Sequence, residues 1–336
     1  MNIKRKLPSN FRSQDIDYFR EQLEINLPPI GVRVTNNYWL LFTSGILFSL
    51  FKIEKQSLLY DSRLSDNGGK ILLVKRFIKA ILKNKIQFLR KHAEFITITN
   101  EWSQNYFHWF TEALPKLVVA TEKGFKPIVL LPAIYNSAFQ FRSLELMNIE
   151  YRIFAGEVLI GKRIIIPNRL APYSAHYNPP VMKRMVELLK LSLAGDANKG
   201  NKIYVSRRQA AKRRIKNEET VIEVLKAFGF YILETEDLSL DEQISIMHHA
   251  DIFVSAHGAG LTNMIFCKEG TKIFELCLKN KILDKCYFNL ANAMDLHYYY
   301  QFCESADSTD DYHTSDLVVD IQELKLNLFK LTNAHD

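Results

Sequence analysis

The sequence predicts an α/β fold made of parallel sheets and divided into two domains. At 336 residues, of which 47% are hydrophobic, the chain is long and apolar enough to bury two cores. From about residue 95 onward, short apolar runs alternate with helical segments, which is the pattern of strands joined by crossover helices. Within that alternation, residues 251–267 have the pattern of a buried strand, a glycine turn and a helix start, which is typical of a ligand-binding edge.

The N-terminal half is predicted to be less regular than the C-terminal half. Residues 1–70 show little periodicity. Their most apolar run, 38–51, is too short to cross about 30 Å of hydrocarbon as a helix, so we expect paired strands there. Residues 71–89 have helical periodicity, with one apolar side formed by Val74, Ile78, Ile81, Leu82, Ile86 and Leu89. The other expected elements are strands at 32–42, 45–59, 95–99, 128–131, 151–154 and 163–166, and helices at 105–122 and 136–147.

The C-terminal half is predicted to form a doubly wound, nucleotide-binding sheet. Four prolines between residues 167 and 180 indicate a crossing between domains, so the predicted domains are 1–175 and 176–336. A final helix, 317–331, is expected to pack back onto the first domain. The expected strands are 202–206, 230–234, 251–256 and 272–277, with helices at 181–193, 218–228 and 240–249.

Basic residues are concentrated in two runs that contain no acid. The net charge is +7, and the runs hold thirteen cations, so the rest of the chain carries −6. The first run, 75–91, has two interpretations: the solvated face of a core helix, which we favour because charge patterns are weak indicators, or contact with anionic lipid. Its cations are Lys75, Arg76, Lys79, Lys83, Lys85, Arg90 and Lys91; those of the second run are Arg207, Arg208, Lys212, Arg213, Arg214 and Lys216.

The cysteines and the N-terminus predict the compartment. The four cysteines show no CxxC spacing, which fits a reducing environment, and residues 1–15 lack an apolar signal segment. We therefore expect a cytoplasmic protein. If the first basic run contacts lipid, the protein is expected to lie at the inner face of the membrane.

The turn at residues 257–260 suits a phosphate group. Gly258 and Gly260 lack a Cβ atom, so the backbone can adopt positive φ and approach a ligand closely. The helix that follows adds unpaired amide groups and the positive end of its dipole. An ordinary strand-to-helix turn is the alternative, and the two glycines alone slightly favour it.

Three weak signals converge on one edge of the C-terminal sheet. Ligands of such sheets bind beyond the carboxyl ends of the strands, where Ser206, the 257–260 turn and Glu275 are expected to emerge. Arg207 or Arg208 can bind phosphate oxygens with two N–H groups, and Glu275 can accept hydrogen bonds from two ribose hydroxyls. Their convergence predicts a nucleotide site.

The helix predicted at 105–122 places polar residues opposite its apolar face. His108 and Glu112 are four residues apart, so the carboxylate can hold the imidazole in the tautomer that a general base requires. A structural histidine with a surface ion pair is the alternative, and the spacing alone favours it. The polar face consists of Asn105, His108, Trp109, Glu112 and Lys116.

Three segments together resemble glycosyltransferase family 61, in its bacterial branch associated with capsular and other surface polysaccharides. They are NYFHWFTEALPKL, IYVSRRQAAKRRIKNEE and DIFVSAHGAGLTNMIFC with KIFEL, and the resemblance covers residues 95–280. It implies a GT-B architecture, with two Rossmann-like domains facing a cleft. It also implies transfer with inversion from a nucleotide sugar, with a UDP-sugar as the expected donor, to a saccharide or lipid-linked hydroxyl. No obligatory metal and no further cofactor are implied.

The same resemblance assigns roles to residues by position. The C-terminal domain would bind the donor, and the N-terminal domain would serve the acceptor side. His108 is the expected base, supported by Glu112, with Glu112 itself as the second choice. The expected donor-binding residues are Asn105, Ser206, Arg207, Arg208, Arg213, His257, Gly258, Ala259, Gly260, Leu261, Thr262, Asn263 and Glu275.

Two other functions stay open from the sequence. A nucleic-acid-binding protein would explain the second basic run, but that run lacks interleaved aromatic residues, so we expect no nucleic-acid partner. If the protein bound sugars without catalysis, His108 and Glu112 would have no evident role. An esterase is discounted because no G-x-S-x-G nucleophile motif occurs.

Overall fold

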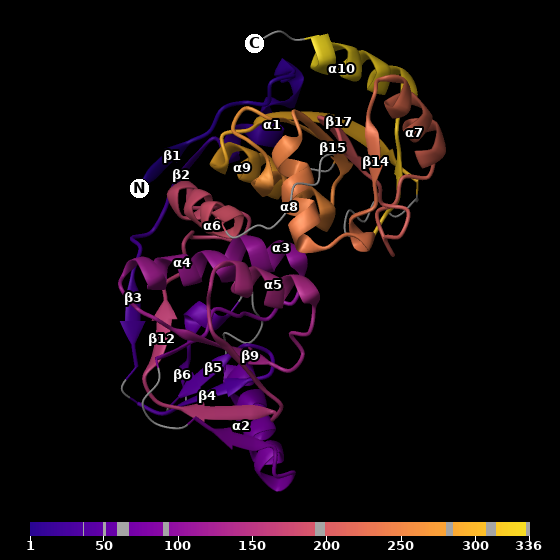
Figure 1. Cartoon of the computed structure of the whole chain (residues 1–336). Coiled ribbons are helices and arrows are strands. Elements are labelled where there is room, and N and C mark those ends of the chain that lie inside the picture. Colours follow the sequence, from indigo (N-terminus) through magenta and orange to yellow (C-terminus); the bar gives the residue numbers. More distant parts are fainter. Residues whose placement is uncertain are drawn as a thin grey trace. The chain divides into compact units, whose positions relative to one another are not determined.

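The computed structural model divides the chain into two compact units (Figure 1). It describes residues 1–35, 37–49, 52–58, 67–89, 94–191, 199–279, 285–306 and 314–333. Unit 1 is Met1 with Leu27–Ser192, and unit 2 is Asn2–Asn26 with Leu193–Asp336. The division therefore falls later than residue 175. The N-terminal segment belongs to unit 2 because Phe19 is fully buried there, with its ring against Phe288 and Tyr300.

Unit 1 contains two five-stranded sheets. The first has the order β10 (Tyr151–Phe154), β9 (Ile128–Pro132), β8 (Phe95–Ile96), β12 (Ile164–Pro167) and β3 (Val32–Val34), and it is parallel except for β3. The second has the order β6 (Lys52–Ile53), β5 (Leu47–Ser49), β4 (Trp39–Phe42), β11 (Val158–Gly161) and β7 (Ile86–Phe88), and only its β11–β7 pair is parallel. The β4–β5 pair confirms the paired strands predicted within residues 38–51.

The two sheets of unit 1 pack face to face, and helices cover the outside. Leu41 and Leu159 of the second sheet share one apolar cluster with Leu130 and Ile164 of the first. Helix α2 (Asn67–Leu82) covers the other side of the second sheet. The remaining helical segments are α3 (Tyr106–His108), a π-turn (Trp109–Ala113), α4 (Leu114–Glu122), α5 (Ala138–Leu146), α6 (Pro179–Leu191) and a 3-10 turn (Lys55–Ser57). Helix α4 lies against β12, and α6 packs on both α4 and α5.

Helix α2 buries a different side from the predicted one. Leu73 and Ala80 are fully buried against the sheet, whereas Ile78, Ile81 and Leu82 are half or more exposed. The helix predicted for residues 71–89 ends at Leu82, and Ile86–Phe88 instead forms strand β7, so Ile86 and Leu89 do not belong to the helix. Within α2, the periodicity could not distinguish the apolar residues that face the core from those that face solvent. Arg90 and Lys91 of the first basic run lie outside the described residues.

Unit 2 is built on one six-stranded sheet. Its order is β14 (Tyr231–Leu233), β13 (Lys202–Val205), β15 (Ile252–Ala256), β16 (Lys272–Leu278), β17 (His297–Ser305) and β18 (Leu317–Val318), and only β18 is antiparallel. Numbered in sequence order within this sheet, its first five strands have the order 2-1-3-4-5, which confirms the predicted doubly wound sheet. The topological switch point lies between β13 and β15, and ligands of this fold bind at its carboxyl end.

The helices of unit 2 enclose this sheet. Helices α7 (Glu218–Ala227) and α10 (Ile321–Asn333) share a buried cluster with Tyr204, Val254 and Phe274 of the strands. The predicted final helix therefore packs within the C-terminal unit. The other elements are α8 (Leu240–His249), α9 (Cys286–Ala293), α1 (Ile16–Phe19), the antiparallel pair β1 (Asn2–Lys4) and β2 (Glu24–Asn26), and 3-10 turns at Ser13–Asp15, Arg20–Gln22, Thr235–Asp237 and Ala259–Phe266.

Candidate active-site residues

The helix that carries His108 and Glu112 is interrupted by a π-turn. Residues Trp109–Ala113 form this turn, directly before Pro115. Proline lacks an amide hydrogen, so a regular helix could not complete its hydrogen bonds across this point. The wider turn accommodates that gap, and such π-turns occur frequently at functional sites. Glu112 lies in this turn, which therefore sets the direction of its carboxylate.

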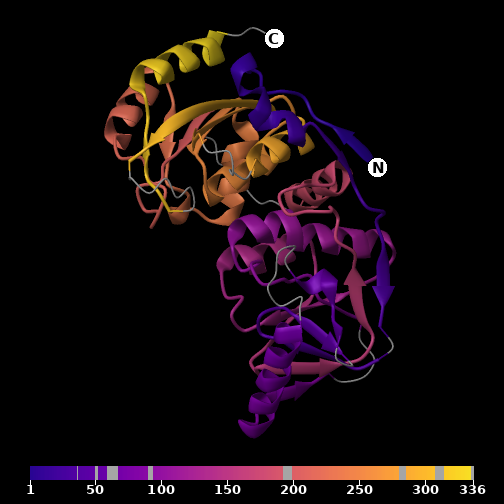
Figure 2. The same ribbon diagram turned by 180° about the vertical axis from the view of Figure 1, so that it is seen from behind.

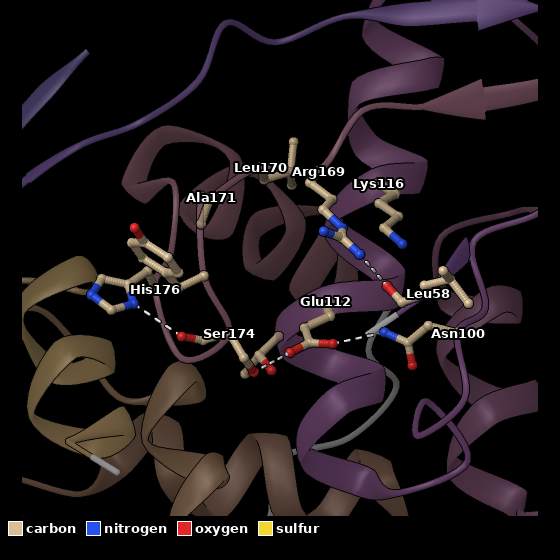
Figure 3. A pocket seen from close by; sticks show the side chains of 11 residues that line it. Leu58, Asn100, Glu112, Lys116, Arg169, Leu170, Ala171, Ser174 and His176 are labelled. Atoms are coloured by element: carbon tan, nitrogen blue, oxygen red, sulfur yellow. Dashed lines mark hydrogen bonds between the residues drawn. The ribbon is translucent and has the colours of Figure 1, made fainter. Parts of the chain in front are cut away.

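The Glu112 carboxylate is held by neutral donors. Asn100 Nδ2 donates to Oε2 at 2.7 Å and Ser174 Oγ donates to Oε1 at 2.9 Å (Figure 3). Burial raises the pKa of Glu112, but the nearby His108 and these hydrogen bonds outweigh it, so the pKa lies below its ordinary value. Glu112 is therefore ionised at neutral pH.

His108 contacts this carboxylate through one ring nitrogen. Nδ1 lies 3.2 Å from Glu112 Oε1, and it makes no hydrogen bond of good geometry with any described residue. The contact is therefore an electrostatic one, of the loose kind common in free enzymes. The edge of the Trp102 ring packs 5.3 Å from the imidazole, and Trp102 is 58% exposed. The ring nitrogen Nε2 is the one left for substrate.

Glu112 also lines a small, cationic pocket inside unit 1. Figure 3 shows the carboxylate in the same pocket as Lys116 and Arg169, with His176 on the Ser174 side. Arg169 donates to the Leu58 carbonyl at 2.7 Å. The full lining is Leu58, Asn100, Thr111, Glu112, Lys116, Arg169, Leu170, Ala171, Tyr173, Ser174 and His176.

In unit 2, two of the predicted residues meet at the switch point. Arg207 follows β13 and Gly258 follows β15, and a Cβ atom on Gly258 would lie 1.9 Å from Arg207 Nη1. Gly258 is therefore needed for the arginine side chain. The left-handed backbone that these glycines would allow is not used in this turn: Gly258 has φ 160°, which is extended backbone, and Gly260 is also outside the left-handed region.

A second guanidinium lies beside Arg207. Burial lowers the pKa of Arg207, and the positive charge of Arg213 lowers it further. Arg207 is fixed by donating from Nε to the Arg213 carbonyl and from Nη2 to the Lys212 carbonyl, both at 3.0 Å. The buried Nε of Arg213 has no hydrogen-bond partner among the described residues. Two clustered cations with an unused donor are suited to an anion.

His257 and Glu275 form a buried pair at the same edge. Nδ1 of His257 lies 2.5 Å from Glu275 Oε1, and Tyr298 donates to Oε2 at 2.6 Å. Glu275 is 3% exposed, and both oxygens are occupied. This does not fit the predicted contact with two ribose hydroxyls, because Glu275 lies within β16 and its carboxylate orients His257.

The other predicted donor residues serve mainly local structure. Asn105 caps α3 by accepting from the Phe107 amide at 3.0 Å, and buried Ser206 accepts from the Arg208 amide at 3.2 Å. Arg208 points to Glu219, with which it pairs at 2.8 Å. The side chains of Leu261, Thr262 and Asn263 are buried, while Ala259 and Gly260 are partly accessible.

Comparison with known proteins identifies the family. The family model described as Glycosyltransferase 61 matches residues 106–274, which is half of the chain. The chain belongs to the glycosyltransferase 61 family. The matched segment contains His108, Glu112, Arg207 and Gly258.

Several relatives of this chain are named EGF domain-specific O-linked N-acetylglucosamine transferase. Those of Bos taurus and Gallus gallus are each 32% identical over 118 residues, which is 33% of this chain and 22% of theirs. The protein of Drosophila melanogaster is 27% identical over 160 residues, covering 41% of this chain and 30% of that protein. The chain thus matches less than a third of the length of these relatives.

Several residues around these candidate sites were not predicted from the sequence. Asn100 lies in the loop before α3, and Arg169 and Ser174 come from a segment far along the chain; no motif connects the three to Glu112. Lys116 was on the predicted polar face, and its spacing of four from Glu112 was the available signal. Tyr298 and Tyr287 were not among the predicted site residues, yet Tyr298 donates to Glu275 and Tyr287 donates to the Gly258 carbonyl, both at 2.6 Å.

Several cations of the second basic run already have partners within unit 2. Arg208 pairs with Glu219, and both Arg214 and Lys216 lie within 4 Å of Asp316, at 3.6 and 3.0 Å. Because Arg207 points inward, four cations of the second run are used within unit 2. The run therefore does not form a continuous phosphate-binding stripe.

Among the described residues, no group of three or more His, Cys, Asp or Glu side chains is arranged to hold a metal ion. In the same part of the chain, no helix combines the length and the apolar character needed to span a bilayer.

The buried Lys116 should make the free energy of unfolding depend on pH. Burial lowers its pKa to about 8, and Arg169 contributes in the same direction, although Glu112 opposes them. Below pH 8 both the folded and the unfolded chain hold this proton. Between about pH 8 and the unfolded value of 10.5 only the unfolded chain holds it, so stability from this group rises with pH.

Replacing Lys116 with methionine should remove this rise. From pH 7 to pH 9.5, the free energy of unfolding of the wild type should increase by about 2 kcal/mol relative to that of Lys116→Met. Urea titrations of both proteins at the two pH values measure the difference. Lys226→Met, which removes an exposed lysine of α7, is the control and should change nothing. If the free energies of unfolding of the wild type and Lys116→Met change equally with pH, the lowered pKa assigned to the buried Lys116 is wrong.

Proposed function

We propose that this protein is an inverting glycosyltransferase that moves a sugar from a nucleotide-sugar donor to a hydroxyl of a saccharide or lipid-linked acceptor. Membership of the glycosyltransferase 61 family supports the reaction class. The observation that carries the proposal is Arg207 against Gly258, with Arg213 beside it, at the switch point of a doubly wound sheet. This edge is where such sheets bind nucleotides.

The donor half of the reaction needs a cationic clamp. When the sugar leaves, negative charge develops on the diphosphate, and preformed donors that stabilise it lower the barrier. Arg213 offers its unpartnered Nε, and Arg207 is held in place by two carbonyl groups. Amides at the start of the Ala259–Phe266 turn lack intrahelical acceptors and add to the clamp. These groups supply the charge that a metal ion would otherwise provide.

The acceptor half needs a base. We assign it to Nε2 of His108, with ionised Glu112 fixing the Nδ1–H tautomer and stabilising the imidazolium that forms. The acceptor hydroxyl gives its proton to His108 as its oxygen attacks the anomeric carbon from the side opposite the leaving diphosphate, which inverts that centre. The exposed Trp102 ring beside His108 offers an apolar surface for the acceptor.

The biological setting is a further part of the proposal. By its resemblance to the bacterial branch, we place the protein in surface polysaccharide synthesis in the cytoplasm, with unit 1 and unit 2 as the two domains of a GT-B enzyme. The relatives' name specifies N-acetylglucosamine as the transferred sugar, so UDP-N-acetylglucosamine belongs among the donors to be tested.

A nucleotide-binding experiment tests the donor site. Calorimetric titration with UDP, other nucleoside diphosphates and their sugars, with magnesium or with EDTA, should show binding that does not require the metal. Arg213→Ala should weaken binding about 10- to 100-fold, because a charged hydrogen bond is lost. Arg208→Ala removes the same charge from a residue that pairs outward with Glu219, so it should bind almost normally. Equal affinities of the two variants would contradict the assignment.

A further inference from the structure

The outer face of helix α2 is apolar, although it points away from the core. Ile71, Ile78 and Leu82 are 57%, 50% and 81% exposed. At 100° per residue these three side chains fall within about 40° of one another and roughly opposite to the buried Leu73 and Ala80. A surface helix normally presents polar residues there. Helix α2 therefore has two apolar faces, and only one of them is used by the fold of unit 1.

Cations lie along one side of this exposed stripe. Lys75 and Lys79 lie next to it on the helix, and Arg76 follows Lys75; all three are exposed. Lys83 and Lys85 follow directly in the turn to β7. The lysine side chains gather around Glu157: Lys85 pairs with it at 3.0 Å, and Lys85, Lys83 and Lys79 together lower the pKa of that carboxyl. The local balance remains strongly positive.

Helix α2 also has an accessible position in unit 1. Figures 1 and 2, which show opposite sides, both show one end of α2 extending beyond the strands of its unit. A flat surface can therefore approach the stripe without meeting the sheets.

We propose that the outer face of α2 binds the surface of an anionic lipid bilayer. Ile71, Ile78 and Leu82 would enter the boundary between headgroups and acyl chains, and the flanking lysines would contact lipid phosphates. An anionic bilayer is the partner that uses both the apolar stripe and the flanking lysines. A nucleic acid would use the lysines but not the isoleucines, and a second copy of α2 would bring like charges together. This surface is independent of the proposed transferase site, and it would hold the enzyme next to a lipid-linked acceptor.

Vesicle sedimentation tests the proposal. The full chain should sediment with vesicles of phosphatidylcholine and phosphatidylglycerol, and much less with phosphatidylcholine alone. Binding should fall when salt is raised from about 0.1 M to about 1 M, because the screening length shortens from roughly 10 to 3 Å.

Matched variants locate the surface. Lys75→Glu with Lys79→Glu should weaken binding at least 25-fold, at about fivefold for each positive charge removed. Lys226→Glu with Lys330→Glu makes the same charge change on exposed lysines of unit 2 and should have little effect. Ile78→Ser with Leu82→Ser should also release the protein, whereas Leu326→Ser with Phe329→Ser, an equally exposed pair on α10, should not.

Three results would overturn the proposal. One is equal sedimentation with neutral and anionic vesicles. Another is an unchanged affinity of both α2 variants, whose exposed substitutions should leave the thermal unfolding curve intact. The third is self-association in light scattering that disappears in Ile78→Ser with Leu82→Ser, which would show that a second copy covers the stripe. Nucleotide binding should be normal in all these variants, so failure here is distinguishable from failure of the proposed function.

Discussion

Replacing His108 with alanine is expected to lower kcat by about 10²- to 10⁴-fold, the range typical of a lost general base. The loss should be largely in kcat, since the imidazole acts on a proton that moves in the transition state. Because the His108 side chain is only 12% exposed, alanine also removes some packing, and a modest loss of stability is expected with the fold retained. Initial rates with the donor found by calorimetry, together with circular dichroism of the variant, measure both expectations.

The companion variant Glu112→Gln separates the two candidate bases. If His108 is the base, Glu112→Gln keeps the hydrogen-bonding shape but removes the negative charge that stabilises the imidazolium as it forms, so kcat should fall moderately. The residual rate should then exceed that of His108→Ala. If instead Glu112→Gln abolishes turnover and His108→Ala leaves it nearly normal, Glu112 is the base and the assignment to His108 is refuted.

The fold was more predictable from the sequence than the site was. The central strands β13, β15 and β16 of unit 2 are almost wholly buried, so they appear as continuous apolar runs, and their alternation with helices predicts a parallel sheet. Helix α2 shows the limit of the same reasoning. The predicted apolar side left out Leu73, which is buried, and included Ile78, which is half exposed, although both carry similar side chains. Only the position of the second sheet decides between them.

Site residues were predictable where a motif marked them and not where they come from separate segments. The spacing of His108 and Glu112 was visible, whereas Asn100 and Ser174, which hold the carboxylate, are 12 and 62 residues from Glu112 in sequence. The role of Glu275 was misjudged for a similar reason. Sequence places it near the end of a strand, but Tyr298 of the neighbouring β17 occupies its second oxygen, and cross-strand pairing is not readable from one chain segment.

Gly258→Ala is expected to disable the donor site while leaving the fold in place. The new Cβ would lie 1.9 Å from Nη1, 2.5 Å from Cζ and 3.0 Å from Nη2 of Arg207. All three atoms belong to the guanidinium, the mobile end of a long side chain, so the arginine should move while the backbone stays. Because φ at Gly258 is 160°, alanine brings no left-handed strain. The expected loss is therefore one of function and not of stability.

The displaced guanidinium should have two measurable effects. It would lose its bonds to the carbonyls of Lys212 and Arg213, and the diphosphate would lose its clamp, so nucleotide affinity should fall about 10- to 100-fold. The value of kcat/KM should fall by about 10²- to 10³-fold, as for a lost oxyanion donor, because charge on the leaving group grows toward the transition state.

Gly260→Ala is the matched control for this prediction. It adds the same methyl group two residues later, where the nearest atom is Cγ1 of Val205 at 3.1 Å and no arginine is touched. A small adjustment of that valine should accommodate it, with activity close to normal. Equal losses in the two variants would mean that the turn tolerates no added volume. Normal nucleotide binding in Gly258→Ala would mean that the position of Arg207 does not matter, and the proposed clamp would then be wrong.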